Sequence, residues 1–212
     1  MPEKPRDEDL DFFGVTHRGY VRTHNEDQFL YCTLHKNLRV GGTSLPNPEL
    51  LEMPSQRLAS FGMVADGVGG RAGGELASRA AVEAVAGYVT HAMECFYVAD
   101  PNNEAVFCET LERAARRGHE AVLARAEKSG MATTLTMMLA VWPTLYLLHV
   151  GDSRCYRLRG GHLELLTRDQ TMAQDLVDSG MLPADRAAES RFAHILSSSL
   201  GGRTSEPAVS TS

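Results

Sequence analysis

The chain has 212 residues, 43% of them apolar, which is enough to build one sizeable hydrophobic core. Its 21 basic and 27 acidic side chains give a net charge of −6. Because nucleic acids reward clustered Lys and Arg, this acidic balance argues against nucleic acid as a partner. We expect a single domain, spanning residues 11–212.

The cysteines, the N-terminal residues and one long uncharged run indicate the cellular compartment. The four cysteines lie far apart without a C-x-x-C pair, which indicates neither a zinc site nor a disulfide framework. Residues 1–11 are charged and are not typical of a signal peptide. The uncharged residues 130–148 approach the length of a membrane span, but their threonines and central Pro143 favour two buried strands. The sequence therefore predicts a cytoplasmic protein without a membrane segment.

The first elements in chain order are short strands. Runs of β-forming residues predict strands at residues 12–16, 27–33 and 59–65. Between the second and third of these, residues 36–57 are rich in Gly and Pro and predict an inserted loop.

Two helices and a second group of strands follow. Apolar residues recur at spacings of three and four from residue 76 to residue 89 and again over residues 104–128, with Leu111, Val122 and Leu123 inward in the second helix. Further strands are predicted at residues 133–142, 144–150, 154–158 and 163–166, with Gly160-Gly161 as a hairpin turn. This order is typical of an α+β fold with two mostly antiparallel sheets flanked by helices.

Carboxylates stand at two strand ends. Glu26 and Asp27 precede a strand and would repel each other unless a cation or hydrogen-bond donors lie between them. Asp66 follows an apolar strand, so its carboxylate points out of the sheet, where it could bridge metal ions, and the carbonyl of Gly67 could add an oxygen ligand. Each segment has a plainer alternative, a polar turn for the first and an Asp-Gly turn for the second.

A third acidic segment lies between two later strands. Asp152 belongs to the sequence Gly-Asp-Ser-Arg at residues 151–154. Taken alone, this segment is typical of a hairpin in which Asp152 caps its own turn.

Together the segments closely resemble the metal-dependent protein phosphatases of type 2C, the PPM family, and above all its small bacterial members. The resemblance rests on five motifs in order: Arg-x-x-x-Glu-Asp at residues 22–27, Asp-Gly-x-Gly-Gly at 66–70, Thr133-Thr134, Val-Gly-Asp-Ser-Arg at 150–154 and Leu-Thr-Arg-Asp-Gln at 166–170. It extends from Gly14 to Ser212. It implies a protein-serine/threonine phosphatase.

The resemblance also implies a metal centre. Asp27 would belong to this centre and Glu26 would support it. Asp66 would bridge two metal ions, Gly67 would give a backbone oxygen, and Asp152 would associate with a third, weaker ion. All-oxygen ligation favours Mg²⁺ or Mn²⁺ over zinc.

Substrate contacts follow from the same resemblance. Arg22 would grip the substrate phosphate, because a guanidinium offers paired charge-assisted hydrogen bonds. A water activated between two metal ions would attack phosphorus in line with the departing serine or threonine oxygen. Residues 168–200 would form a flap beside the active site.

The chain departs from the family pattern at two places. Val68 stands where some eukaryotic relatives carry a His proposed as general acid, so the leaving group would take its proton from water or another group. Family members also have two further aspartates, in an Asp-Gly and an Asp-Asn pair, whereas the last aspartate here is Asp185. We therefore expect a fragment in which residues 206–212 begin a strand, and an impaired catalyst.

Three functions remain open. The leading hypothesis is a cytoplasmic phosphatase that acts on phosphorylated proteins, opposes a bacterial Ser/Thr kinase and has neither a nucleic acid nor a membrane as partner. The second is a non-catalytic relative that binds phosphorylated protein or a partner through Arg22 and its helix faces. The third is a phosphatase dedicated to a regulatory partner, which no residue separates from the first.

Overall fold

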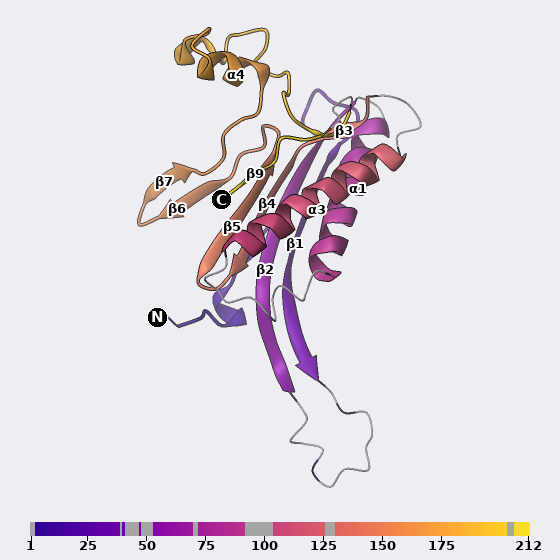
Figure 1. Ribbon diagram of the computed structural model, residues 1–212, viewed down its shortest axis with the longest axis vertical. Coiled ribbons are helices and arrows are strands. Elements are labelled where there is room, and N and C mark those ends of the chain that lie inside the picture. The colour runs from indigo at the N-terminus through magenta and orange to yellow at the C-terminus, as the bar shows by residue number, and fades with distance from the viewer. Residues whose placement is uncertain are drawn as a thin grey trace.

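The computed structural model describes residues 3–38, 40, 47, 53–69, 72–91, 104–125, 130–202 and 206–212 (Figure 1). In chain order its elements are η1 (Asp7–Asp9), β1 (Asp27–Leu38), β2 (Met53–Val68), α1 (Ala72–His91), α3 (Glu104–Arg125), β3 (Ala132–Thr133), β4 (Leu135–Val141), β5 (Thr144–Val150), β6 (Tyr156–Arg159), β7 (His162–Leu165), α4 (Met172–Asp178), η3 (Ala184–Arg186), β8 (Leu200–Gly201) and β9 (Ser210–Thr211). The α+β class predicted from the sequence is confirmed.

One antiparallel sheet is the scaffold. Within the described residues it has seven strands, in the order β8-β3-β2-β4-β5-β9, with β1 on the other side of β2. β1 and β2 continue beyond the rest of the sheet as a long two-stranded arm (Figure 1). The second sheet is the ribbon β6–β7, which turns at Gly160-Gly161 with φ values of +57° and +78°, so the predicted hairpin is confirmed.

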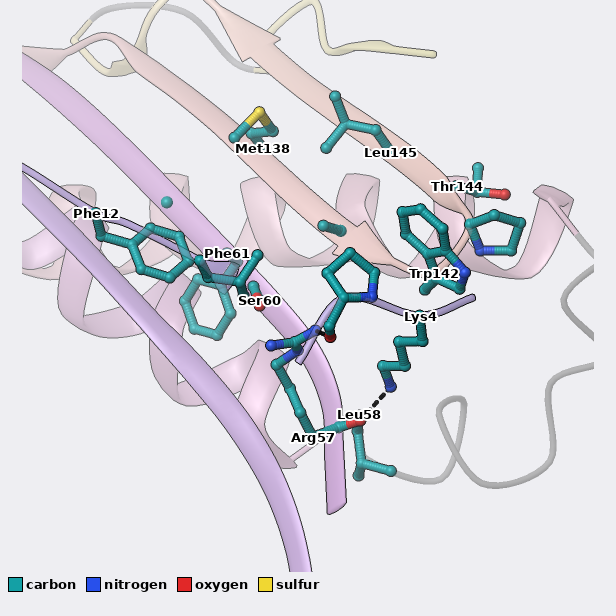
Figure 2. A pocket seen from close by; sticks show the side chains of 15 residues that line it. Lys4, Phe12, Arg57, Leu58, Ser60, Phe61, Met138, Trp142, Thr144 and Leu145 are labelled. Atoms are coloured by element: carbon teal, nitrogen blue, oxygen red, sulfur yellow. Dashed lines mark hydrogen bonds between the residues drawn. The ribbon is translucent and has the colours of Figure 1, made fainter. Parts of the chain in front are cut away.

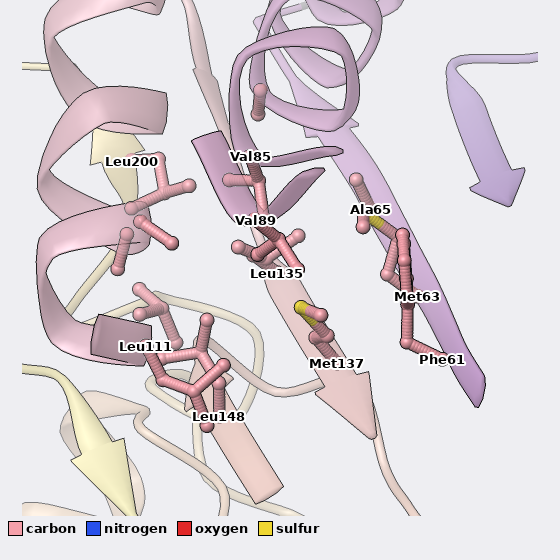
Figure 3. Close-up of a cluster of buried hydrophobic side chains, with 14 of the residues drawn as sticks. Phe61, Met63, Ala65, Val85, Val89, Leu111, Leu135, Met137, Leu148 and Leu200 are labelled. Atoms are coloured by element: carbon pink, nitrogen blue, oxygen red, sulfur yellow. The ribbon is translucent and has the colours of Figure 1, made fainter. Parts of the chain in front are cut away.

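Helices α1 and α3 pack on each other and cover one face of this sheet (Figure 1). Side chains on a strand alternate between its faces, so every second residue of β2 points toward the helices. The resulting core is apolar and closely buried (Figure 3), and its members include Phe61, Met63, Ala65, Val85, Val89, Leu111, Leu135, Met137, Leu148 and Leu200. No helix in the described part of the chain is long and apolar enough to cross a membrane.

Three expectations about the elements were wrong in whole or in part. Residues 12–16 take part in no strand pairing within the described chain, and Phe13 is 88% exposed. A β-forming run becomes a strand only where a neighbouring strand accepts its backbone hydrogen bonds. The loop predicted over residues 36–57 is shorter, since β1 reaches Leu38 and β2 begins at Met53; most of the residues between lie outside the described part. Leu123 points outward.

The sheet face opposite the helices carries exposed apolar side chains. They come from strands β1, β2, β4 and β5. Examples are Phe29, Tyr31, Val64, Met138 and Leu145. A cavity of about 330 Å³ opens on this face, bordered by Phe12, Met138, Trp142 and Leu145 (Figure 2). An apolar patch of this kind is unusual on the surface of a soluble domain.

The N-terminal segment is fastened to this face at Arg57. The guanidinium of Arg57 is almost fully buried and donates to a carboxylate oxygen of Asp7 at 2.7 Å and to the carbonyl oxygen of Pro5. In return, the ammonium of Lys4 donates to the carbonyl oxygen of Arg57 (Figure 2). Phe12 stacks on Tyr31, with ring centroids 5.6 Å apart. These contacts hold residues 4–12 across the end of the sheet.

A matched pair of substitutions on α3 tests the packing. Leu111 is 0% exposed and Leu123 is 42% exposed. Leu111→Ala is expected to lower the free energy of unfolding by about 2–5 kcal/mol, because it removes buried surface and leaves a cavity. Leu123→Ala is expected to change it by about 0.5 kcal/mol or less. Urea denaturation measures both, and equal losses would contradict this placement of α3.

Candidate metal centre

The first two predicted metal residues lie opposite each other. Asp27 opens β1, Asp66 lies near the end of β2, and the two are direct partners in the antiparallel pairing. Directly opposed residues in such a pair bring their Cβ atoms to about 4.5–5.5 Å, where like charges destabilise the sheet. The structure therefore places two carboxylates together at a position where a sheet alone would not favour them.

The electrostatics of Asp66 report its neighbours. Its pKa is raised from 3.8 to about 6, first by partial burial of the carboxyl group, although the residue keeps an exposed surface. The charges of Asp27 and Asp152 and a hydrogen bond with Asp27 raise this pKa further, and the charge of Arg22 lowers it. All three predicted neighbours are thus close enough to act on Asp66. A cation between the carboxylates would reverse the effect.

Glu26 supplies a second sign of a missing positive partner. Its residue is 7% exposed, and its Oε2 atom has no hydrogen-bond partner among the described residues. Among the described residues, its ion-pair partner is Arg22, whose Nη1 lies 3.6 Å away, beyond hydrogen-bond length. Glycine at position 74 makes room for this carboxylate, since a Cβ there would lie 2.6 Å from Oε2. Buried carboxylate oxygens are nearly always partnered, so this one indicates an unfilled contact.

The backbone of Asp66 is held by two threonines from the next strand. Its N–H donates to Thr134 Oγ1 at 2.9 Å, and its carbonyl oxygen accepts from Thr134 N–H and Thr133 Oγ1, both at 2.9 Å. The sequence marked these threonines only as a motif. Two hydroxyl side chains side by side in an apolar run were the signal that they satisfy buried polar groups.

Asp152 lies in the connection from β5 to β6. β5 pairs with β4 and β9, whereas β6 pairs with β7, so the interpretation of residues 151–154 as a simple hairpin was wrong. Gly151 has φ +106°, and a Cβ there would lie 2.6 Å from the Thr134 methyl group. The connection therefore packs against Thr134, which hydrogen-bonds the backbone of Asp66, and this explains why the charge of Asp152 reaches that residue.

The donor set fits a hard divalent cation that keeps part of its water. No three His, Cys, Asp or Glu side chains in the described part of the chain lie together closely enough to form a complete site. Mg²⁺ commonly binds through one or two carboxylates and retains several waters. The opposed Asp27 and Asp66 meet that requirement, and Glu26 provides an unpartnered oxygen beside them.

Two cavities adjoin the carboxylates. One, of about 360 Å³, is bordered by Asp27, Asp66, Ser153 and Arg154. His17 also borders this cavity, close to the predicted site. The other, about 490 Å³, lies between Asp152 and the region of α4 and η3 and also borders Arg154. The space in front of the carboxylates and the space beneath the predicted flap therefore meet at Arg154.

His149 is a core residue, 2% exposed. Its side chain is buried, its Nδ1 lies 2.9 Å from Thr136 Oγ1, and its Nε2 donates to the carbonyl oxygen of Arg168 at 3.0 Å. Burial lowers the pKa of this imidazole. With both ring nitrogens engaged, His149 ties β5 to residue 168 and has no nitrogen left for a metal ion.

Comparison with known proteins decides the family. The family described as protein phosphatase 2C matches residues 53–179, more than half of the chain. The chain belongs to the protein phosphatase 2C family. The α+β fold and the order of the acidic motifs are those expected for it.

Two curated bacterial relatives share this family's sequence features. The serine/threonine protein phosphatase PstP of Mycobacterium tuberculosis is 35% identical over 150 residues, which cover 69% of this chain and 27% of PstP. The protein phosphatase PhpP of Streptococcus pneumoniae is 30% identical over 191 residues, which cover 88% of this chain and 66% of PhpP. The chain thus spans about a quarter of the length of the mycobacterial relative.

Solved phosphatase 2C structures share the fold. The M. tuberculosis phosphatase PstP/Ppp superposes with a TM-score of 0.66 at 29% identity, covering 93% of this chain and 71% of that one. Its catalytic domain in complex with two manganese ions superposes with a TM-score of 0.61 at the same 29% identity, over 93% of this chain and 70% of that one. The S. agalactiae serine/threonine phosphatase, at 21% identity, has a TM-score of 0.65 over 93% of this chain and 72% of that one and supports the fold alone.

Removing the charge of Asp66 is expected to stabilise the metal-free protein. The folded-state pKa of about 6 lies above the ordinary 3.8, so between these values the folded protein binds more protons than the unfolded chain. The free energy of unfolding then falls as pH rises through this window. In EDTA at pH 7.5, Asp66→Asn should raise the thermal midpoint and flatten its dependence on pH.

Asp11→Asn is the matched control, because Asp11 is an exposed aspartate that borders neither of the two cavities at the carboxylates. It should leave both the midpoint and the pH dependence as in the wild type. A lower midpoint for Asp66→Asn than for the wild type would contradict the repulsion described above.

Proposed function

We propose that this protein hydrolyses phosphoserine and phosphothreonine in other proteins with the help of Mg²⁺ or Mn²⁺. The observation that carries the proposal is the opposed pair Asp27 and Asp66; partial burial first, and then the charge of Asp27, raise the pKa of Asp66 to about 6. Relatives at 30–35% identity bear the names of serine/threonine and protein phosphatases, which supports the same activity here.

Each site residue has a part in this reaction. Asp27 and Asp66, with the carbonyl oxygen of Gly67, would hold two ions, and Asp152 would hold a third. Glu26 would fix the waters around them through its unpartnered oxygen. When bound, the ions lower the pKa of a water and neutralise charge on the phosphoryl oxygens.

Arg22 would bind the phosphate group itself. Its side chain is 70% exposed, and the 3.6 Å ion pair with Glu26 aims it at the carboxylates. A guanidinium in that position offers two parallel N–H donors to a phosphate dianion. Val68 beside the site cannot donate a proton, so we assign protonation of the leaving oxygen to water.

The biological setting follows the same proposal. The substrates would be phosphorylated proteins, among them the products of a bacterial Ser/Thr kinase, and the reaction would take place in the cytoplasm. Residues 11–212 would act as one domain, with residues 168–200 as the flap. Phosphoproteomic comparison of cells with and without the gene tests the proposed substrates. Cell fractionation tests the proposed compartment.

A binding function is the second candidate, and one observation favours it. Fewer than three metal-binding side chains gather at any point of the described chain, so the cations would be weakly held. Arg22 would still attract a phosphate group. The protein would then bind phosphorylated partners without hydrolysing them, as a non-catalytic member of the family.

Mn²⁺-dependent release of phosphate from a phosphothreonine peptide distinguishes the two functions. Metal ions supply several kcal/mol to such reactions, so Asp66→Asn should lower kcat/KM by about 100-fold or more. The exposed Asp11→Asn should match the wild type. No release by the wild type, together with peptide binding that Arg22→Ala abolishes, would establish the binding function instead.

Replacement of Arg22 tests its contact with phosphate. A charge-assisted hydrogen bond contributes about 1.5–3 kcal/mol, so Arg22→Ala should raise KM for the phosphopeptide by about tenfold or more. Arg22→Lys keeps the charge but loses the paired geometry and should fall between. Arg113→Ala, an exposed arginine on α3, serves as control. An unchanged KM in Arg22→Ala would remove Arg22 from the site.

A further inference from the structure

The predicted metal residues belong to two different units of the structure. Asp27 and Asp66 are fixed in the main sheet, as partners in the β1–β2 pairing. Asp152 belongs to the connection that follows β5. The relative position of these units sets the distance between the ion at Asp152 and the ions at the aspartate pair.

The connection that carries Asp152 is joined to the first residues of the flap. The N–H of Gly151 donates to Gln170 Oε1 at 2.8 Å, and the N–H of Gln170 donates back to the carbonyl oxygen of Gly151 at 2.8 Å. Arg154 donates to both carboxylate oxygens of Asp169, at 2.9 and 2.6 Å. Asp152 is therefore joined both to β5, which ends two residues before it, and to the flap, so its position relative to Asp66 depends on further contacts with the sheet.

Ser153 makes such a contact. Its Oγ lies 2.8 Å from Thr134 Oγ1, and its carbonyl oxygen accepts a hydrogen bond from Thr136 Oγ1 at 3.1 Å. Thr134 Oγ1 is the same atom that accepts the N–H of Asp66 at 2.9 Å. A single hydroxyl group thus joins the backbone of one predicted ligand to the residue that follows another.

The environment makes this link stronger than a surface hydrogen bond. Thr134 is 1% exposed and Thr136 is 5% exposed, so water does not compete for their hydroxyl groups. Breaking a buried hydrogen bond leaves polar atoms unsatisfied, which costs more than the bond itself contributes. Ser153 also borders the cavity in front of Asp27 and Asp66, so the link lies next to the predicted metal site.

We infer that Ser153, through Thr134, is a positioning residue that fixes the distance between the cation at Asp152 and those at Asp27 and Asp66. The inference rests on the proposed function, because it concerns the same metal site. Ser153 itself binds neither cation nor phosphate. Loss of its hydroxyl group would remove the direct link to Thr134 and loosen Asp152 relative to Asp66, while the hydrogen bond from Thr136 to the carbonyl oxygen of residue 153 remains.

Calorimetric titration with Mn²⁺ tests the inference without relying on catalysis. Loss of a residue that orients a metal ligand commonly weakens metal binding by about 10–100-fold. Ser153→Ala should therefore raise the dissociation constant of the weakest Mn²⁺ site by about tenfold or more and leave the tighter binding close to the wild type. The metal-free thermal midpoint, measured in parallel, separates this effect from a general loss of stability.

Thr134 allows the same link to be cut from the other side. Thr134→Val has nearly the same shape without the hydroxyl and should weaken Mn²⁺ binding, whereas Thr134→Ser keeps the hydroxyl and should restore it. The matched control is Thr90→Val, because within the described part of the chain the Thr90 hydroxyl donates inside α1, to the carbonyl oxygens of Ala86 and Gly87. Hydrogen exchange of the Asp66 amide should be about tenfold faster in Thr134→Val, with or without metal.

The outcomes are distinguishable. If the wild type binds Mn²⁺, Asp66→Asn abolishes binding and Ser153→Ala binds as tightly as the wild type, the inference is overturned and the proposed function stands. If the wild type and Asp66→Asn bind Mn²⁺ equally poorly, both the inference and the proposed function are contradicted. Weaker binding in Ser153→Ala and Thr134→Val, with recovery in Thr134→Ser, supports the inference.

Discussion

Two negative charges on neighbouring strands repel each other, and here the pairing of β1 with β2 holds them in place against that repulsion. The pairing cannot slip, because a shift of one residue would turn Phe61, Met63 and Ala65 out of the core beneath the helices. The hydrophobic core thus supplies the free energy that keeps Asp27 and Asp66 opposed. A divalent cation would convert the same opposition into a favourable contact, and this links the stability of the fold to the proposed chemistry.

Much of the site could be predicted from the sequence, because the site residues lie in recognisable local patterns. An aspartate after an apolar strand and a second one at the start of another strand are visible without coordinates. Their neighbourhood across 39 residues of chain followed from the resemblance to the family, and the register of the strands bears it out. The hydrogen bonds of Thr134 with Asp66 and Ser153 could not be read in this way, since they join residues 68 and 19 positions apart.

The expectations that failed share a physical cause. Residues 12–16 have the composition of a strand, but β-propensity describes fitness for a pleated, half-buried surface, and within the described chain they have no strand beside them. The segment 151–154 has the composition of a hairpin turn, yet Gly151 packs on Thr134 and directs the chain away from β5. In both cases a contact with a distant part of the chain decided the structure, and local sequence contains no record of such contacts.

The exposed apolar face of the sheet has a consequence for how the molecule behaves in solution. Apolar side chains, among them Tyr31, Val64, Met138 and Leu145, are exposed to solvent on this face. Within the described residues, the outer edge of β1 next to them has no strand partner. Surfaces of this kind favour self-association, and an unpaired strand edge gives the associated chains a template. Salts of the sulfate type strengthen apolar burial and would then precipitate the protein at a low salt concentration. Dilution of the protein and mild detergent would keep it dispersed.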